Sequence, residues 1–497
     1  MRRFFQSTNN LTLSAAITIF FLFYSIIIVL PGFSLLKDPD TLWHIRTGQW
    51  ILDNRQFPRV DFYSWTAVGK RWLAGEWLSE ILFALAFGLG QWRGVVILSA
   101  VTIAAIVATL SLYLLQNLRF SVAIGWTILT AFAISPHYLA RPHLFSFLLL
   151  LVWLIILIDA YDGGDFKPPV FVLVILMALW ANLHGSFTLG FALLCIFVGY
   201  FCCEKFVQRV HSRCRSTFLM LLAVGVGALL TPYGIFSALA TLELFNTNFP
   251  FQRIAEWRSP DFQAYQPLLV LFVGLFGIIA GLGIRLRGPR LIVFSIMLLL
   301  GLGHIRGLLM FFLIAPVIFA RPIAERSVWW RATRLTKVNS SEGAGELDPM
   351  LRYFQKRPII VPTICLAVAV LATASSWRYT NNGPPESIAP KGAIDFVRQN
   401  GISGNVFNSY DFGGYLIFSG IPTFIDGRVT PYTDDFLWKH AEAVNLVDIN
   451  KAFRLLDDYK VSWVILRPTE PMAKALERSA LWNEVYADKY SEVFVRR

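Results

Sequence analysis

The chain has 497 residues, of which 56% are hydrophobic and only 15% are charged, and its formal net charge is +12. Soluble domains usually carry about a quarter charged residues, so this composition excludes a soluble globular protein and indicates a polytopic membrane protein. The basic residues fall mainly in short gaps between apolar runs, where membrane topology places them. We therefore expect no nucleic-acid partner. The five cysteines lie in or beside apolar segments and show no metal-ligand spacing, so we expect neither a disulfide framework nor a cysteine metal site.

The first apolar run, at 11–36, follows Arg2 and Arg3. It is longer than the apolar core of a typical signal peptide, lacks a small-x-small cleavage site and is followed by further apolar runs. These features predict an uncleaved first helix with its basic end in the cytoplasm.

Eleven apolar runs are long enough to cross, or nearly cross, about 30 Å of hydrocarbon. Several are shorter than about 20 residues, which predicts broken or tilted helices around a cavity. The run at 77–92 is ambiguous, because it can be a full span or a helix lying partly in the interface. The eleven runs are 12–36, 94–117, 122–136, 143–160, 169–181, 187–203, 216–231, 268–284, 291–303, 307–320 and 358–376.

The distribution of Lys and Arg decides between the two topologies. The most basic gaps are 204–215, 285–290 and 321–357. They fall on the same side as Arg119 and the N-terminus only if 77–92 is not a crossing. Because basic loops stay in the cytoplasm, this is the topology we expect, with the N-terminus inside and the C-terminus outside.

Two large polar regions then face outward, a first loop at 37–76 and a tail at 377–497. Residues 1–376 form the predicted transmembrane domain, and the tail is long enough to be a domain of its own. Short β-rich runs alternate in the tail with helical stretches, which predicts a small α/β domain. The β-rich runs are 423–426, 461–466 and 492–495, and the helical stretches are 390–400, 433–447 and 450–459.

The first outer loop is the segment richest in chemistry. Asp38 and Asp40 flank a proline, and two carboxylates so close repel unless a cation or a proton reconciles them. Carboxylates are also hard ligands for Mg²⁺ or Mn²⁺, so Asp38 and Asp40 are candidate metal ligands. Equally, the Asp-Pro-Asp sequence could simply cap a helix over 41–53, an amphipathic segment expected to lie on the membrane surface. Glu76 lies at the same outer interface and is a further candidate catalytic acid.

Polar residues recur at the other outer ends of the predicted spans. Any one of them could be a satisfied core group or a helix cap, but ionisable groups gathered on one face of a membrane protein indicate function. Sugar transfer from a phosphate leaving group needs such a mixture, with a carboxylate to deprotonate the acceptor and arginine or a metal to offset charge on the departing phosphate. The candidates are His137, Arg141, His143, Asn182, His184, Glu256, Arg258, His304 and Arg306.

The first loop, DPDTLWHIRTGQWILDNRQFPRVDFYSWTAVGKRWLAGEWLSE, resembles the first outer loop of bacterial GT-C-like membrane glycosyltransferases. The later pieces RPHLFS, WANLHGSF, TPYG, EWRSPDF and GHIRG, and the tail pattern NSYDFGGYLIFSG…TFIDGR, recur in the same order, so the resemblance covers nearly the whole chain. It implies a multi-helix membrane fold and a polyprenyl-phosphate-linked sugar donor.

The resemblance also implies roles for individual residues. A first-loop acid, Asp38 or Asp40, acts as base or holds a divalent cation. The second outer loop often supplies another acid, but here it reads SPHYLARPH and has none, so His143 or Glu256 would have to compensate. The residues expected to bind the donor phosphate or the substrate are His44, Arg141, His143, His184, Glu256, Arg258, His304 and Arg306. The three arginines among these could instead anchor the protein at lipid headgroups.

The tail has two compact polar clusters, one at 408–415 and one at 426–428. They could contact the acceptor, or they could tie the tail down over the membrane domain, and we favour the structural role slightly. The residues concerned are Tyr410, Asp411, Asp426 and Arg428.

These features predict an inverting hexosyl- or pentosyltransferase on the periplasmic face of a bacterial inner membrane. It would transfer a sugar from a polyprenyl-phosphate donor to a glycan, lipid or protein of the cell envelope. A flippase for lipid-linked glycans and a non-catalytic assembly scaffold are the alternatives, although the halves of the chain show no convincing repeat of the kind transporters have. The sequence has no Walker loop, zinc-protease motif or nucleophile elbow.

Overall fold

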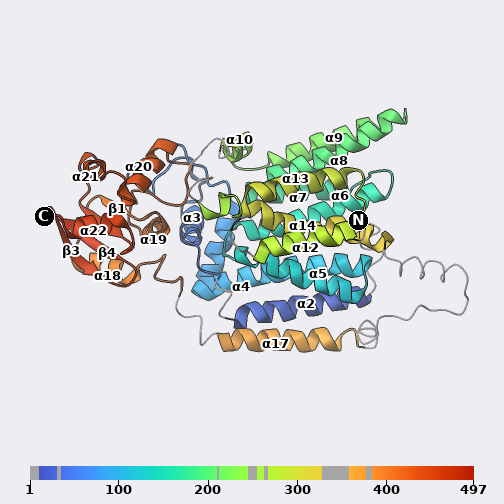
Figure 1. Ribbon diagram of the computed structural model, residues 1–497, viewed down its shortest axis with the longest axis horizontal. Helices are drawn as coiled ribbons and strands as arrows, with labels where there is room; N and C mark the ends of the chain where they lie inside the picture. Colours follow the sequence, from blue (N-terminus) through green and yellow to red (C-terminus); the bar gives the residue numbers. More distant parts are fainter. Residues whose placement is uncertain are drawn as a thin grey trace, which may run out of the picture.

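The computed structural model (Figure 1) describes residues 10–30, 35–209, 212–243, 254–261, 263, 267–281, 283–326, 357–376 and 383–497. Most of the basic gap predicted at 321–357, and the start of the predicted tail at 377–382, lie outside the described residues.

Within these ranges, each of the eleven predicted apolar runs holds one helix. Five of the helices are at least 18 residues long and apolar enough to cross a membrane by length and composition. The others are shorter, as the sequence predicted. The helices are α2 (Asn10–Val29), α4 (Trp77–Asn117), α5 (Phe120–Ala133), α6 (His143–Asp162), α7 (Val170–Leu183), α8 (Phe187–Val207), α9 (Ser212–Ala228), α12 (Pro267–Gly281), α13 (Pro289–Gly303), α14 (Ile305–Arg326) and α17 (Ile360–Ser376).

The helices form a bundle with an apolar outer surface. Large apolar side chains stand exposed on several helices, among them Phe171, Val273 and Leu371. In water such a surface would be unfavourable, whereas lipid requires it, because helices satisfy their backbone groups internally and present side chains to hydrocarbon. Inside the bundle, Trp153 and Trp180 are completely buried.

The bundle has two distinct ends. The residues that form the tail domain, 383–497, lie at one end of the long axis in Figure 1. Helix α6 begins at that end and covers about 30 Å in 20 residues, so Asp159 and Asp162 reach the opposite end. There Arg290 donates two hydrogen bonds of 2.6 Å to Asp162, and Arg321 pairs with both carboxylates.

The ambiguous run at 77–92 forms the first part of α4 and is not a crossing. Gly90 and Gln91 have non-helical backbone angles and divide this part from the rest of the helix. Its end contacts the tail domain, since the rings of Phe87 and Trp92 lie 5.6 and 5.3 Å from that of Phe418. Its start lies beside the first loop at the same end of the bundle. Both ends of the segment therefore lie at the same end of the bundle.

The helix predicted over 41–53 is α3 (Asp40–Asn54). The sequence predicted that this helix lies on the membrane surface, and in the structure neighbours cover two of its sides. A β-carbon on Gly48 would stand 2.0 Å from the carbonyl oxygen of Glu80 in α4, so the two helices touch backbone to backbone. On another side, α3 packs against α19 (Gly413–Phe418) of the tail domain, and Figure 1 shows it between the bundle and that domain.

The tail domain is a mixed α/β unit, as predicted. Its sheet has the order β1-β2-β4-β3, with β1 parallel to β2 and the other pairs antiparallel. The strands are β1 (Val406–Asn408), β2 (Trp463–Leu466), β3 (Trp482–Ala487) and β4 (Glu492–Arg496). The helices around the sheet are α18 (Lys391–Gln399), α19, α20 (Asp434–Val444), α21 (Ile449–Asp458) and α22 (Pro471–Glu477), with a short 3-10 turn, η4, at Tyr410–Phe412.

The run at 423–426, expected as a strand, forms only an isolated bridge between Ser64 and Thr423. The reason is a side chain that takes the place of a neighbouring strand. Asn408 accepts hydrogen bonds from the backbone N–H groups of Phe424 and Ile425 and donates one to the Ile425 carbonyl. A side-chain amide therefore forms the hydrogen bonds that a neighbouring β-strand would otherwise form with these backbone groups.

The first loop packs on the edge of the tail domain. Trp65 and Thr423 are joined by a backbone hydrogen bond of 3.0 Å, and Thr423 donates another to Tyr63. The indole of Trp65 donates to the carbonyl of Val406 in β1 at 3.1 Å. The loop thus belongs as much to the tail domain as to the membrane bundle.

Candidate active site

Several chain segments at this end of the bundle meet under the tail domain, and hydrogen bonds join them in pairs. The segment before α6 bonds to the first loop, since Ala140 N–H donates to the Leu35 carbonyl and Thr41 donates to the Ala140 carbonyl. The Trp77 indole donates to Asn182 at the end of α7 at 2.6 Å. The short turn η3 (Ala255–Trp257) is joined to the start of α14, because Ile305 N–H donates to the carbonyl of Arg258.

Asp38 and Asp40 share one arginine. Arg141, from the segment before α6, places Nη1 at 3.0 Å from Asp38 and Nη2 at 2.7 Å from Asp40. Asp38 also accepts the N–H of Asp40 at 2.8 Å, which satisfies the first N–H of α3. The capping and the functional interpretations of Asp-Pro-Asp are thus compatible, because one Asp oxygen caps the helix while the others face a cation.

A third acid joins this group from η3. Glu256 lies 3.5 Å from Nη1 of Arg141 and 2.9 Å from Nη2 of Arg306. His137, in the short turn η1 (Ser135–His137), lies 3.9 Å from Glu256. We call the three acids Asp38, Asp40 and Glu256, together with their two arginines, the acid–arginine cluster. Of the two residues proposed to compensate for the acid missing from the second loop, Glu256 belongs to this cluster and His143 does not.

A second group surrounds Glu76, the residue before α4. Glu76 lies 3.2 Å from Nε2 of His184 and 3.6 Å from Nε2 of His44. The other ring nitrogen of His44 lies 3.3 Å from Glu80, which is almost completely buried. Sequence reasoning overlooked Glu80, although it stands one helical turn after Glu76, a spacing that places both on one face.

The remaining predicted residues of the membrane domain lie near these groups without joining them. His143 is buried, and its Nε2 lies 2.9 Å from the carbonyl oxygen of His137. His304 holds η3 in place through a 2.7 Å hydrogen bond to the carbonyl of Trp257. The side chain of Arg258 is exposed, whereas its carbonyl accepts the N–H of Ile305.

The tail domain closes over the acid–arginine cluster through two glycines. A β-carbon on Gly427 would stand 2.0 Å from Oδ1 of Asp40, and one on Gly414 would stand 2.2 Å from the carbonyl oxygen of Pro39. A β-carbon would clash at either contact, so the two glycines allow the tail backbone to approach the Asp40 carboxylate and the Pro39 backbone closely. The tail domain therefore forms one wall of the site.

Arg428 joins the first loop to the tail domain. Its buried guanidinium lies 2.6 Å from Asp61 of the loop and 2.7 Å from Asp426. It also stacks on Trp72, with the guanidinium carbon 4.6 Å from the ring centre. Asp426 further accepts a 2.6 Å hydrogen bond from Tyr432. These contacts correspond to the tie between domains that the sequence analysis slightly favoured, and sequence reasoning did not identify Asp61.

The other two tail candidates differ in position. Tyr410, in η4, is close enough to the site for the Asp40 charge to affect it, and burial raises its pKa well above the usual value, with Asp40 adding to the increase. Asp411 points elsewhere, since it pairs with Arg467 at 2.7 Å within the tail domain.

Burial sets the protonation of the site. It raises the pKa of Asp40 to about 7, against the opposing charge of Arg141, and likewise raises that of Glu76 to about 7. Burial would also raise the pKa of Glu256, but Arg141 and Arg306 outweigh it and hold that pKa below its usual value. Burial lowers the pKa of His184 to about 3, so the ring next to Glu76 is neutral at pH 7.

The donor set around Asp38 and Asp40 does not fit a divalent cation in this arrangement. Each oxygen of the two carboxylates already accepts a hydrogen bond, from Arg141, from the Asp40 N–H or from the Trp43 indole. Mg²⁺ and Mn²⁺ need several oxygen ligands at once. Among the described residues, no group of three or more His, Cys, Asp or Glu could hold a metal ion.

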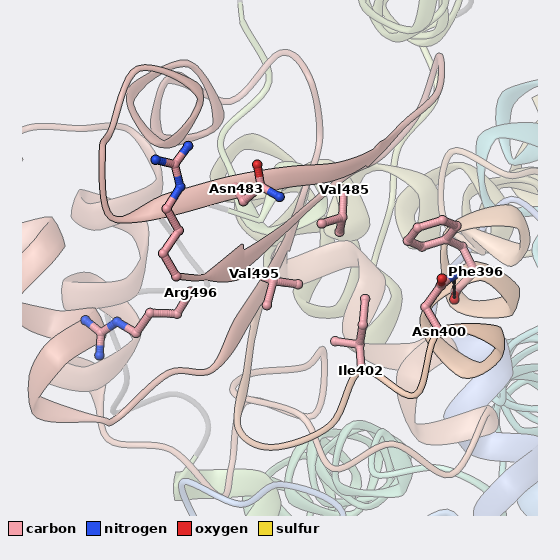
Figure 2. Close-up of a pocket in the computed structure, with 8 residues that line it drawn as sticks. Phe396, Asn400, Ile402, Asn483, Val485, Val495 and Arg496 are labelled. Carbon is pink, nitrogen blue, oxygen red and sulfur yellow. Dashed lines mark hydrogen bonds between the residues drawn. The ribbon is translucent and has the colours of Figure 1, made fainter.

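A separate hollow opens on the sheet of the tail domain (Figure 2). Apolar side chains from α18, β3 and β4 form its floor, and it contains none of the acids described above. It therefore offers no general base or acid. Its lining residues are Phe396, Asn400, Ile402, Asn483, Val485, Val495, Arg496 and Arg497.

No protein-family model matches the sequence, and no curated protein matches it either. Solved structures do match the fold. The apo crystal structure of the Archaeoglobus fulgidus oligosaccharyltransferase matches with a TM-score of 0.54 at 12% identity, covering 91% of this chain and 69% of that one. The archaeal oligosaccharyltransferase AglB from Archaeoglobus fulgidus, in complex with an inhibitory peptide and a dolichol-phosphate, gives a TM-score of 0.53 at 11% identity with the same coverage.

A third match covers nearly the full length of both chains. ArnT from Cupriavidus metallidurans in the apo state has a TM-score of 0.52 and 13% identity, and 97% of each chain is covered. At such low identities the likeness concerns the fold. The chain therefore has the polytopic fold of the GT-C membrane glycosyltransferases, as the resemblance of its first loop implied.

Proposed function

We propose that this protein is a membrane glycosyltransferase that uses a sugar donor linked to a polyprenyl phosphate. The observation that carries the proposal is the acid–arginine cluster, which lies between the membrane bundle and the tail domain. There a lipid-linked donor can enter from the bilayer and an acceptor from the water. The proposal is supported by the shared fold, since one protein with this fold was solved in complex with dolichol-phosphate.

The arrangement suits a single displacement at the anomeric carbon. An acceptor hydroxyl loses its proton to a carboxylate, and its oxygen forms a bond to that carbon. The bond from the anomeric carbon to the phosphate oxygen breaks, and the polyprenyl phosphate leaves with the electron pair. One displacement inverts the anomeric configuration, so we propose an inverting hexosyl- or pentosyltransferase.

Asp40 is the carboxylate we assign as the base. A pKa of about 7, raised by burial, suits a general base at neutral pH. Asp38 accepts the N–H that begins α3 with one oxygen and binds Arg141 with the other. Asp38 therefore positions both Asp40 and the arginine.

Two arginines suit the leaving group. Arg306 is partly exposed and stacks on Trp257, with its guanidinium carbon 5.1 Å from the ring centre. A guanidinium presents a planar fork of donors that matches phosphate oxygens. We assign Arg306 to binding the donor phosphate, with Arg141 beside it. We assign His184 and His44 to orienting Glu76, which we expect to face the sugar.

The location we propose is a bacterial inner membrane, with the N-terminus in the cytoplasm and the tail domain in the periplasm. The end of the bundle away from the tail carries Arg290, Arg321 and the basic gap that begins near Lys205. Basic residues concentrate on the cytoplasmic side. The acceptor is then a glycan, lipid or protein of the envelope.

A transfer assay on the full-length protein in lipid tests the proposal. It would use a panel of short-chain polyprenyl-phosphate sugars with candidate acceptors, and it would measure the release of polyprenyl phosphate. Release is expected from the wild type and lost in Asp40→Asn. Asp53→Asn is the matched control, because Asp53 is exposed on the same helix. Donor binding without release across the panel would instead favour a flippase or a scaffold.

A further inference from the structure

The most unusual feature of the candidate site is an arginine side chain that lies among three carboxylates. Arg141 stands between Asp38 and Asp40 and also reaches Glu256, with nitrogen–oxygen distances of 3.0, 2.7 and 3.5 Å. The three acids come from two separate parts of the chain, and their charges repel unless a cation or a proton lies among them. In this arrangement the guanidinium is that cation.

The backbone holds Arg141 in this position. The residue before it, Ala140, is fixed on both sides, because its N–H donates to Leu35 at 2.8 Å and its carbonyl accepts from Thr41 at 2.9 Å. Thr41 belongs to α3, the helix that Asp40 begins. The arginine and its two aspartates are therefore parts of one hydrogen-bonded unit.

A divalent cation and Arg141 exclude each other here. A metal ligated by Asp38 and Asp40 would need the two oxygens that now face Nη1 and Nη2. It would then lie within a few ångströms of a permanent positive charge, where Coulomb repulsion at low dielectric is strong. Arg141 and Arg306 together supply two positive charges, the same charge as one divalent ion.

The geometry points to a site in which Arg141 takes the place of a divalent cation, so that sugar transfer proceeds without a metal. This inference rests on the proposed function, because it concerns the same site. It reverses the expectation that Asp38 and Asp40 ligate Mg²⁺ or Mn²⁺. In this chain the acids instead order the arginine, and the arginine and Arg306 balance the charge that develops on the leaving phosphate.

Two measurements on full-length protein in lipid test the inference. The first is Mn²⁺ binding followed by electron paramagnetic resonance, which does not depend on activity. Wild type should bind no Mn²⁺ at Asp38 and Asp40, so its spectrum should equal that of Asp38→Asn/Asp40→Asn. Arg141→Ala should gain a Mn²⁺ site that the same two substitutions remove.

The second measurement is transfer in the presence of a chelator. Wild-type transfer should change by less than twofold when EDTA replaces Mg²⁺ and Mn²⁺. Arg141→Ala should lose at least 100-fold, with partial recovery in millimolar guanidinium, whereas Arg141→Lys should lose less because it keeps the charge without the fork. Asp53→Asn is again the control for expression and fold.

The outcomes separate the two proposals. One equivalent of Mn²⁺ on the wild type that disappears in Asp38→Asn/Asp40→Asn would overturn the inference, as would loss of transfer with EDTA. If no donor is ever turned over, the proposed function fails, while the resonance experiment still decides whether arginine or metal occupies the acids. If Arg141→Ala does not fold, the wild-type spectrum and the chelator experiment still give a decision.

Discussion

The backbone of Gly427 in the tail domain lies directly against the carboxylate of Asp40 in the first loop. A β-carbon at Gly427 would meet Oδ1 of Asp40 at 2.0 Å, and the three nearest atoms all belong to Asp40. The obstacle is the end of one side chain and not a stretch of backbone. A larger residue at this position would therefore move Asp40 and leave the fold largely intact.

We expect Gly427→Ala to lower transfer by 10- to 1,000-fold with little change in thermal stability. The reason is that Asp40 would leave its hydrogen bond with Arg141, and a misplacement of about 1 Å can reduce a rate about 100-fold. The measurement is kcat/KM beside a melting curve in the same lipid. Gly88→Ala is the control, because a β-carbon at Gly88 meets nothing within 4 Å. Equal activity of the two variants would show that the contact with Asp40 is unimportant.

The pH dependence of transfer should report the base. Burial raises the pKa of Asp40 to about 7, and a base acts in its deprotonated form. Transfer should therefore increase about tenfold per pH unit below pH 7 and level off above it. The measurement is kcat/KM between pH 5.5 and 8.5.

Glu76 has a raised pKa in the same range, so the profile alone does not distinguish the two acids. Glu76→Gln separates them. If Asp40 is the base, the variant keeps the rising limb at a reduced rate. A flat profile in Glu76→Gln would assign the titrating base to Glu76 and contradict the role given to Asp40.

The ion network around Arg428 should be the main electrostatic tie between the first loop and the tail domain. Its guanidinium is buried between Asp61 and Asp426, so its removal leaves two buried carboxylates without their partner. Breaking such a pair usually costs about 3–5 kcal/mol. Arg428→Met should therefore reduce the stability of the tail domain by this order of magnitude and make the loop at 59–72 more accessible to protease.

Lys439→Ala provides the comparison for Arg428→Met. Lys439 forms an exposed pair with Asp435 one helical turn away, and such exposed pairs contribute little to stability because solvent screens them. Denaturant unfolding followed by a probe in the tail domain measures both variants. If the two variants differ by less than about 1 kcal/mol, the network does not hold the domains together.

Much of the membrane fold could be predicted from the sequence, because lipid imposes a simple rule on helices such as α6 and α14. Long apolar runs must be helical, and basic gaps choose the side. The segment 77–92 could not be assigned in this way, since its apolar run fits both a crossing and an interface helix. The contacts of Phe87 and Trp92 with Phe418 decide it, and they join residues more than 300 positions apart.

Site residues could be predicted from the sequence only where the order of the membrane helices places them at the same end of the bundle. Arg141, Glu256 and Arg306 stand at outer ends of helices, so they had to lie on one face. Their pairing with Asp38 and Asp40 depends on side-chain geometry that no spacing reveals. Glu80 was missed because it lies inside an apolar run, where its contact with His44 is invisible in the sequence.

The tail domain should lose stability in mild acid because of one histidine. His440 is buried, its Nε2–H donates to the Asn408 carbonyl at 2.9 Å, and burial lowers its pKa to about 4. In the unfolded chain the pKa is near 6.5, so between these values the unfolded state binds more protons. Stability is therefore complete above about pH 7 and falls as the pH decreases. From these two pKa values the loss between pH 7.5 and 5.5 is on the order of 1 kcal/mol.

Hydrogen exchange of the β1 and β2 amides in the full-length protein measures this loss. His440→Gln keeps a donor for Asn408 but cannot titrate, so its unfolding free energy should change less with pH than that of the wild type, by on the order of 1 kcal/mol. Because His440 is the only histidine in residues 383–497, the difference between the two proteins isolates its titration from that of the acidic groups. Equal pH dependence in both would mean that folding does not lower the pKa of His440, and would contradict the prediction.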